Sequence, residues 1–416
     1  MRITQVRQIL TLSFSRRHSP AIPALCLLAL LLFACEARLA RVTPPGLPAD
    51  GWVRDTAPIL TAGAWGEDGL QDHSIADPDV LYDPAAGIWH VWYQTARGEK
   101  YISEENRMVI RHALSADPGA GWIVDLQPAL ELPEDSTAWD ATHSETPSVV
   151  YDPDTPADRR YKLYYSGASR QLELGFPDYQ IGLAISADGR TFRRLPENES
   201  PYGRAGLVLR VEDALPDVPN LAGGVVADPE IKLIEGVYHL WFSSFAHDTK
   251  NNFLAFGISH ATSEDGIHWI SSPGDPIPSL RNAGNAGGQQ PSVAWNPILK
   301  RWEMWFTSDS EDERETIPST FNPALGFWMA VSADGETWEV DYSAPRDAYW
   351  RPDSPDEEFG LLTGAEVVIV DGVRHLFYTG WGGVNVPDGF LVPLRDRRGY
   401  APAVLSLLHA VMDAAE

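Results

Sequence analysis

A short strand headed by a polar residue and a proline recurs along this chain of 416 residues, and this repeat constrains the fold more than any other feature. It reads ADPDVLYD at 76–83, ETPSVVYD at 145–152, ADPEIKLI at 227–234 and QQPSVAW at 289–295. A fifth unit, without the proline, begins near Gly364. An aromatic strand follows in every unit: WHVWYQT (89–95), YKLYYSG (161–167), YHLWFSS (238–244), WEMWFTS (302–308) and RHLFYTG (374–380). Such self-similarity indicates a repeat architecture.

Two further segments complete each unit. An apolar segment ends in a turn, as in IGLAISADG (181–189) and WMAVSADG (328–335), and a short segment with an aromatic start follows it. Alternating strands joined by Asp-Gly turns are typical of antiparallel hairpins. The 15 Trp residues also suit β-sheet better than a helical bundle. Four strands in each of five units predict an all-β fold, a five-bladed β-propeller of four-stranded antiparallel blades.

The two ends of the repeat predict how this propeller closes. The fifth unit lacks a fourth strand, because the chain ends soon after VLSLLHAV (404–411). GWVRDTAPIL (51–60) matches GWIVDLQPAL (121–130), the fourth strand of the first unit. We therefore expect the N-terminal strand to close the last blade, since closure removes exposed strand edges. Residues 51–416 are then a single propeller domain.

The first 35 residues have the pattern of a targeting segment. Four arginines precede an apolar run from Ala21 to Ala34, which is too short for a comfortable transmembrane helix. The run ends Leu-Phe-Ala-Cys, which resembles the lipobox of bacterial lipoproteins. The resemblance implies a signal peptide at 1–35 ending at a lipidated Cys35, a linker at 36–50, and export to the cell envelope with only a lipid anchor in the membrane. A plain secretory peptide or an uncleaved anchor is the alternative.

The charge and the cysteine count exclude other classes of protein and site. A formal net charge of −26 leaves no basic footprint, so no nucleic-acid partner is expected. Cys26 and Cys35 are the only cysteines, and Cys26 lies in the segment that would be removed. An internal disulfide and a cysteine metal site are therefore both excluded.

The long connections and the starts of the proline-headed strands fall on one face of the predicted propeller. Insertions gathered on one face of a repeat array mark a binding face. The residue before each proline is expected to point into the opening at the centre of this face, which we call the mouth. These positions hold Asp77, Thr146, Asp228, Gln290 and, in the fifth unit, Gly364. Glu145, next to Thr146, brings a third carboxylate towards the axis.

Three carboxylates around one pocket suit acid–base chemistry. Like charges at close range raise one another's pKa, and burial acts in the same direction. A protonated acid beside an ionised base is what cleavage of a glycosidic bond requires. The candidate catalytic residues are therefore Asp77, Glu145 and Asp228, with a carbohydrate as partner. No cofactor is required and no metal ligand is assigned; a structural calcium ion at the axis is left open.

The DP and ExP strand heads and the five-unit architecture resemble the clan of arabinanases, β-xylosidases, invertases and levansucrases. That resemblance covers about residues 51–411 and implies a propeller glycosidase acting on furanosides and related sugars. It implies that Asp77 is the base or nucleophile and that Asp228 fixes the sugar and tunes pKa values. Glu145, in the sequence ETP, matches the ExP motif in which the clan's glutamate acts as the acid.

The order of the motifs differs from that clan. There the ExP glutamate follows the later DP aspartate, whereas this chain has Gln289-Gln290-Pro291 at that place. An amide cannot deliver a proton as a carboxylic acid can. Either Glu145 supplies the acid from another blade, or the protein is a non-catalytic carbohydrate-binding or scaffold propeller with a degenerate site.

Other residues near the mouth are candidates for holding a sugar. Histidines precede the first two proline-headed strands in similar settings, and aromatic rings on mouth loops suit stacking against sugar rings. The candidate substrate-binding residues are His73, His143, Gln290, Trp139, His247 and Trp381. By contrast, Asp79, Glu230 and Glu366 lie one residue beyond the proline position and are expected to form hydrogen bonds between blades.

Overall fold

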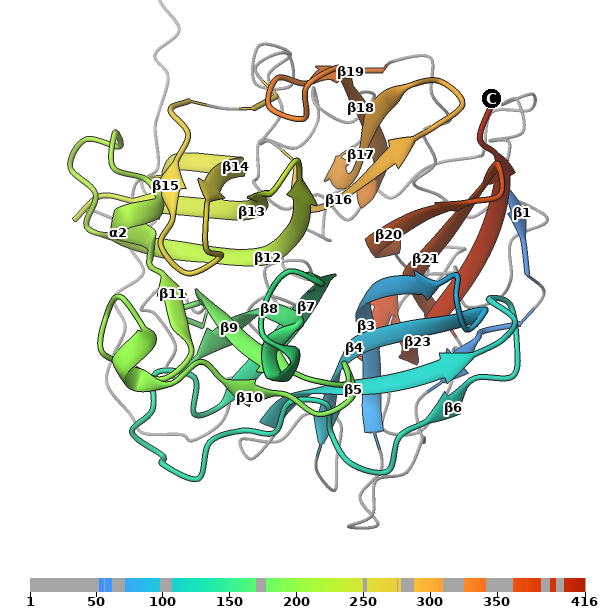
Figure 1. The fold of residues 1–416 in the computed structure, drawn as a ribbon, viewed down its shortest axis with the longest axis horizontal. Helices are drawn as coiled ribbons and strands as arrows, with labels where there is room; N and C mark the ends of the chain where they lie inside the picture. The colour runs from blue at the N-terminus through green and yellow to red at the C-terminus, as the bar shows by residue number, and fades with distance from the viewer. Residues whose placement is uncertain are drawn as a thin grey trace, which may run out of the picture.

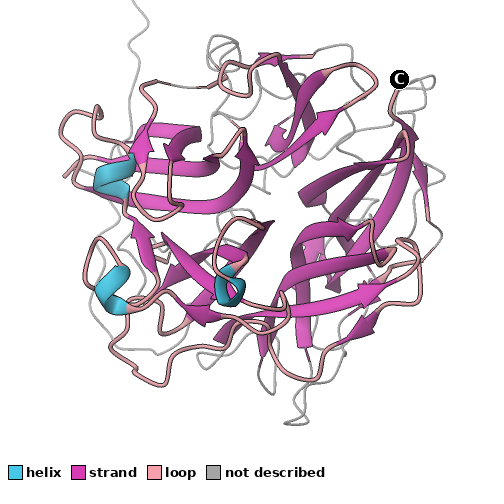
Figure 2. Cartoon of the chain, in the orientation of Figure 1, coloured by secondary structure: helices cyan, strands magenta, loops and turns pink. Residues whose placement is uncertain are grey.

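Strands dominate the part of the chain that the structure describes. The computed structural model describes residues 52–55, 57–61, 72–97, 107–169, 177–249, 253–274, 276–277, 288–309, 325–341, 362–382, 390–393 and 400–415. The helices described within these ranges are short: η2 (Ala157–Arg159), η3 (Glu197–Glu199) and α2 (Val211–Ala214). Figure 2 shows the strands filling the molecule, which confirms the all-β prediction. The expected signal peptide with Cys35 and the linker at 36–50 lie outside the described residues.

The first segments of the five repeat units form the inner strands. They are β3 (Asp72–Asp83), β7 (His143–Tyr151), β12 (Gly223–Ile234), β16 (Gln289–Asn296) and β20 (Leu362–Val370). Each inner strand contacts the next in this order, and β20 contacts β3. Figure 1 shows the five strands around the centre of the molecule. The starts of these strands therefore meet near one axis.

The aromatic segments pair antiparallel with the inner strands. They are β4 (Ile88–Arg97), β8 (Tyr161–Ala168), β13 (Val237–His247), β17 (Arg301–Asp309) and β21 (Val373–Gly382). Successive residues such as Trp241 and Phe242 are both fully buried. Successive side chains of a strand point to opposite faces. The second strand of each unit is therefore covered on both of its faces by neighbouring parts of the protein. This burial explains why these segments are continuously apolar.

The outer half of each unit follows the expected order. The third strands are β5 (Arg107–Ser115), β9 (Gln180–Ser186), β14 (Phe253–Ser263), β18 (Leu325–Ser332) and β23 (Tyr400–Asp413). The short outer strands are β6 (Ile123–Val124), β10 (Arg193–Arg194), β15 (Ile270–Ser271), β19 (Glu339–Val340) and β1 (Val53–Arg54). Three further strands also pair with third strands: β2 (Leu60–Thr61), β11 (Leu207–Leu209) and β22 (Phe390–Pro393).

The N-terminal segment pairs with the last sheet, as the match between 51–60 and 121–130 predicted. In β1, Val53 lies opposite Val411 of β23, and in β2, Leu60 lies opposite Leu407. Figure 1 shows blue β1 beside the red strands of the C-terminal sheet. The beginning and the end of the described chain therefore share one sheet.

One feature of the sheet organisation differs from the separate units that were expected. Met108 of β5 pairs in parallel with His143 of β7, which joins the first two units into one nine-stranded sheet. The third and fourth units remain separate four-stranded sheets. The hydrogen bond from Met108 N to the carbonyl of Thr142, 3.2 Å long, belongs to this junction. It ties the segment leading into β7 to the first unit.

Candidate active site at the central pocket

Each inner strand carries a β-bulge at the residue that was predicted to point into the mouth. The pairing register shifts between Ala76 and Asp79 in β3, and at the equivalent place in the other four inner strands. The bulged residues all have positive φ: Asp77 (48°), Thr146 (45°), Asp228 (51°), Gln290 (53°) and Gly364 (58°). Positive φ is uncommon outside glycine, and bulges re-aim side chains next to active sites. The backbone therefore turns these five residues towards the axis.

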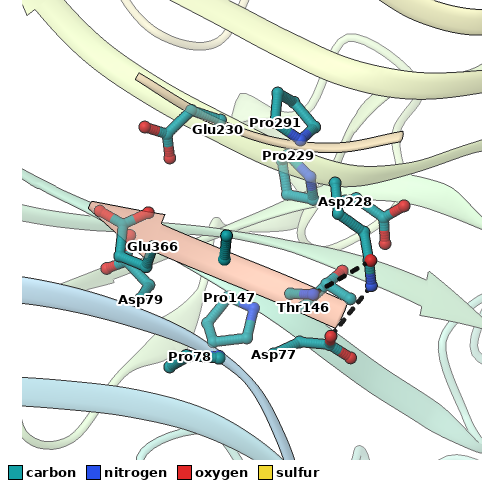
Figure 3. Close-up of a pocket in the computed structure, with 13 residues that line it drawn as sticks. Asp77, Pro78, Asp79, Thr146, Pro147, Asp228, Pro229, Glu230, Pro291 and Glu366 are labelled. Atoms are coloured by element: carbon teal, nitrogen blue, oxygen red, sulfur yellow. Dashed lines mark hydrogen bonds between the residues drawn. The ribbon is translucent and has the colours of Figure 1, made fainter. Parts of the chain in front are cut away.

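The five strand starts enclose a central pocket of about 330 Å³, including space open to solvent. Its lining comes from three successive layers: the bulged residue and the proline or Ala365 after it in all five inner strands, and the next residue in β3, β12 and β20. Figure 3 shows Asp77, Thr146 and Asp228 at one end and Asp79, Glu230 and Glu366 at the other, with the prolines between. The two predicted aspartates, Asp77 and Asp228, share this pocket.

Hydrogen bonds link the bulged residues of neighbouring units, in four of the five junctions through the sixth residue of an aromatic segment. Gln94 Oε1 accepts from Thr146 N (2.9 Å), Ser166 Oγ accepts from Asp228 N (2.9 Å), and Ser243 Oγ accepts from Gln290 N (2.9 Å). The fifth strand repeats the pattern, since Thr379 Oγ1 accepts from Asp77 N (2.8 Å). These polar residues stabilise the strained bulges. The sequence shows them as a polar sixth residue in every aromatic segment, a signal that our sequence predictions missed.

Burial raises the pKa of all three candidate carboxyl groups, and neighbouring carboxylates add to the shift for Asp77 and Glu145. Burial and the nearby charge of Asp228 raise the pKa of Asp77 to about 7. Burial raises the pKa of Asp228 to about 6, although Ser243 opposes the shift with a hydrogen bond. Burial raises the pKa of Glu145 to about 8, with further contributions from Asp77 and Asp228 and an opposing hydrogen bond from Tyr179. Glu145 does not line the pocket, but its charge is coupled to both aspartates that do.

Glu145 is held by two neighbours. Tyr179 Oη donates to Glu145 Oε2 at 3.0 Å, and His143 Nε2 lies 3.7 Å from Glu145 Oε1. Burial lowers the pKa of His143 to about 4, so this imidazole is neutral at pH 7. The Thr142 hydroxyl donates to the carbonyl of Ala168 (3.0 Å) and therefore accepts from His143 Nδ1 (2.7 Å). The lone pair of Nε2 then faces Glu145, an arrangement that suits a protonated carboxyl.

The deeper layer of the pocket connects neighbouring units of the repeat. Asp79 Oδ2 accepts from Val149 N (3.0 Å), and Glu230 Oε1 accepts from Val293 N (2.7 Å). Serines fill the alternate positions, since Ser148 Oγ accepts from Ile231 N (3.1 Å) and Ser292 Oγ from Val367 N (2.9 Å). For Asp79 and Glu230 the expected hydrogen bonds between units are confirmed. Glu366 in turn accepts a hydrogen bond from Ser292.

Lys232 supplies a positive charge to this deep acidic cluster. Carboxylate oxygens of Asp79, Glu230 and Glu366 lie within 4.8 Å of one another, close enough to hold a metal ion. Lys232 Nζ, however, lies 2.7 Å from Glu230 Oε1 and 3.9 Å from Glu366 Oε1. Burial raises the pKa of Asp79 to about 7 and that of Glu366 well above its ordinary value. An ammonium group and bound protons therefore already reduce the charge of these carboxyls.

The structure places the other predicted residues at different distances from the pocket. Gln290 lines it, and His143 contacts Glu145. His247 ends β13 next to Gly223, the first residue of β12, and its Nδ1 lies 3.1 Å from the carbonyl of Asp248. The backbones of His73 and Trp381 belong to β3 and β21, but their side chains lie outside the described part of the structure.

Trp139 is not an open platform for a sugar ring. Its side chain is 6% exposed, stacks on Tyr165 at 5.8 Å, and donates its indole N–H to the carbonyl of Ala205 at 2.8 Å. Close packing against Gly167 also fixes the ring. We therefore assign Trp139 a role in core packing, since a loop tryptophan close to a strand start is equally able to turn inward.

Gly364 is expected to be essential for the geometry of Asp77. A Cβ atom at Gly364 would lie 2.3 Å from Asp77 Oδ1, so Gly364→Ala must displace the Asp77 carboxylate. An activity that depends on the position of the Asp77 carboxylate is expected to fall by about tenfold or more in this variant, since small misplacements of a reacting group have effects of this size. The matched control is Gly236→Ala, because Gly236 also has positive φ (84°) but open space around its Cβ position. Equal kcat/KM values for the two variants would contradict this role.

Comparison with known proteins gives a likeness at the level of the fold. No protein-family model and no curated protein matches the chain. Among solved structures, a complex of BT0996 and RGII matches with 15% sequence identity and a TM-score of 0.57, over 86% of this chain and 92% of that protein. A glycoside hydrolase matches with 14% identity and a TM-score of 0.57, over 87% of this chain and 92% of that protein. A glycosyl hydrolase from Bacteroides ovatus matches with 14% identity and a TM-score of 0.52, over 89% of this chain and 96% of that protein. The chain therefore has the propeller-type all-β fold of these proteins.

Proposed function

We propose that this protein is a glycoside hydrolase that cleaves glycosidic bonds of an oligosaccharide or polysaccharide, furanosides included. The observation that carries the proposal is the meeting of Asp77 and Asp228 in one central pocket, with Glu145 near enough to interact electrostatically with both. The fold likeness to glycoside hydrolases supports it, as does a neighbour that is an RGII complex. The carboxyl groups supply proton transfer directly, so bond cleavage needs no metal ion.

The pKa values favour a division of roles among the three groups. With a pKa of about 8, Glu145 holds its proton at pH 7 and can act as the acid. Asp77, with a pKa of about 7, can accept a proton, and Asp228, the most readily ionised of the three, fixes the sugar and tunes its neighbours. Two titratable groups whose environments separate their pKa values are the pattern of an acid–base pair. In this assignment Glu145 replaces the acid that Gln289-Gln290 cannot supply.

The proposed architecture is a five-bladed propeller whose last blade is closed by β1. Five inner strands in ring order and the pairing of β1 with β23 support this closure. A structural calcium ion at the axis stays a proposal without assigned ligands, since Lys232 already contacts the carboxyl groups of Glu230 and Glu366 there. His73, His143, Gln290, His247 and Trp381 remain proposed contacts of the sugar.

The protein is further proposed to be an exported lipoprotein of the cell envelope, anchored through Cys35. The support is the N-terminal pattern of arginines, apolar run and lipobox-like end. In the ranges that the structure describes, no helix is both long and apolar enough to span a bilayer. Metabolic labelling with a fatty acid tests the anchor, since Cys35→Ser is expected to abolish incorporation of the label.

The second candidate function is non-catalytic binding of carbohydrate. Gln289 favours it, because this amide stands at the ExP position where the resembled glycosidase clan has its acid. A protein of this kind would bind a sugar in the same pocket without turnover.

The pH dependence of kcat/KM is expected to be bell-shaped, with its maximum between pH 7 and 8. Below about pH 7 Asp77 takes up a proton and is lost as a base, and above about pH 8 Glu145 loses the proton that it must deliver. Each limb should fall about tenfold per pH unit. Steady-state kinetics from pH 5 to pH 10, in roughly half-unit steps, checks this. A maximum near pH 5 would contradict the assigned roles.

The function is tested by incubating the soluble protein with arabinan, xylan, fructan, RGII and aryl furanosides. Sugar release and binding are measured separately, by product chromatography and by calorimetry. Release from any substrate supports the hydrolase. Binding to one of them without release supports the second candidate function. The absence of both release and binding overturns both candidate functions.

A further inference from the structure

Gln290 reaches across the mouth because the fifth unit has no side chain at its bulge. Gln290 Nε2 donates to Asp77 Oδ1 at 3.0 Å and passes over Gly364 to do so. Figure 3 shows this hydrogen bond as a dashed line. The next bulged residue along the ring, Gly364, leaves the space that a larger side chain would fill. Gln290, the residue between Gln289 and Pro291, is therefore in direct contact with the candidate base.

The orientation of the Gln290 amide is fixed by its oxygen. Gln290 Oε1 accepts from Thr307 Oγ1 at 3.0 Å and from the Gly364 backbone N–H at 3.1 Å. With both donors on the oxygen, the NH₂ group is the only part of the amide that can face Asp77. Gln290 can therefore donate a hydrogen bond to Asp77 but cannot accept one from it.

Gln94 repeats this arrangement on the other side of Asp77. Its Oε1 accepts from the Thr146 backbone N–H at 2.9 Å, and its side chain forms a second hydrogen bond to Asp77. Gln94 is 8% exposed and is the polar sixth residue of its aromatic segment. Asp77 thus receives two amide donors, whereas Asp228 has the single hydroxyl of Ser243.

We infer that Gln94 and Gln290 form an amide clamp that positions Asp77 and holds it as an ionised, proton-accepting carboxylate. Hydrogen bonds donated to a charged carboxylate favour the charged form. A protonated Asp77 would find no acceptor on Gln290, whose amide oxygen already accepts two hydrogen bonds, from Thr307 and Gly364. Where the inference names Asp77 as the base, it rests on the proposed function. It gives Gln290 a positioning role in addition to its proposed contact with the sugar.

The test replaces one clamp amide with a carboxyl group. In Gln290→Glu the side chain keeps the acceptor for Thr307 and Gly364 but turns a carboxyl oxygen towards Asp77. Like-charge repulsion should then raise the ionisation midpoint of Asp77 by about one pH unit or more. Gln290→Met removes one donor without adding charge and should raise the midpoint by less. Gln180→Glu is the matched control, because Gln180 Oε1 likewise accepts a backbone N–H, that of Val211.

The ionisation of Asp77 is read directly from the ¹³C resonance of its carboxyl group, assigned by its loss in Asp77→Asn. The ascending limb of kcat/KM is measured on the same variants. A midpoint that rises in Gln290→Glu, and less in Gln290→Met, with no change in Gln180→Glu, supports the clamp. An unchanged midpoint in both Gln290 variants overturns it. A shifted midpoint in a protein that releases no sugar supports the clamp and rejects the hydrolase instead.

Discussion

Asp77→Asn is expected to lower kcat/KM for sugar release by about 10²–10⁴-fold, the usual contribution of a general base. The amide keeps the size of the side chain but cannot accept the proton. Asp77 lines the pocket and is coupled to Asp228 and Glu145, so the loss should appear in kcat while substrate binding stays within a few fold. Kinetics and calorimetry on the same substrate separate the two quantities.

This loss should not result from unfolding. Because burial raises the pKa of Asp77 to about 7, the stability linked to this group is fully present below the ordinary carboxyl range and is lost as the pH rises through 7. Removing the charge therefore should not lower the free energy of unfolding at pH 8. A variant that is inactive and also much less stable would contradict this explanation.

Lys232→Met is expected to lower the free energy of unfolding by about 3–5 kcal/mol, the cost of leaving a buried charge without its partner. Asp79, Glu230 and Glu366 are each no more than 3% exposed, and Lys232 lies 2.7 Å from Glu230. Without the ammonium group, the cluster must bind protons or unfold. The deficit should therefore shrink as the pH falls, since protonation then relieves the repulsion.

Urea denaturation at about pH 8 and pH 5 measures this effect. Lys300→Met is the control, since Lys300 is exposed in the turn between β16 and β17. It should change stability by less than about 0.5 kcal/mol. Equal unfolding midpoints for Lys232→Met and Lys300→Met would show that the acidic cluster does not depend on Lys232.

The repeat was enough to predict the inner strands and the meeting of Asp77 with Asp228. Each DP head lies at the same register of its unit, so any arrangement of the units around an axis brings these residues together. The alternation of Asp79, Ser148, Glu230 and Ser292 was also readable, since each must accept a backbone N–H from the next unit. The pairing of residues 51–60 followed from their match to 121–130.

Contacts that cross between units were harder to predict. Tyr179 reaches Glu145 from a segment outside the repeated strands, and Trp139 turns inward although its loop leads to the mouth. The amide clamp depends on the missing side chain of Gly364, a relation between three different units. Lys232 could have been found, because it lies two residues after Glu230 and therefore on the same face of β12.

The bulged backbone explains why residue types vary at the mouth while the conformation does not. Positive φ at Thr146 is costly for a β-branched residue, and hydrogen bonds from Thr146 to Gln94 and Ser166 offset this cost. The same conformation carries Asp77, Asp228 and Gln290. One scaffold thus presents acids, an amide or a hydroxyl, and the chemistry of the site depends on which of these each unit carries.

The most direct test of the central claim, that Glu145 is the acid, compares two substrates with the same sugar and different leaving groups. A natural alcohol must be protonated as it departs, whereas a dinitrophenolate leaves without help. For Glu145→Gln, we expect kcat/KM to fall by about 10²–10⁴-fold on the natural glycoside and by less than tenfold on the dinitrophenyl glycoside. Equal losses on both substrates, or none on either, would show that Glu145 does not deliver the proton.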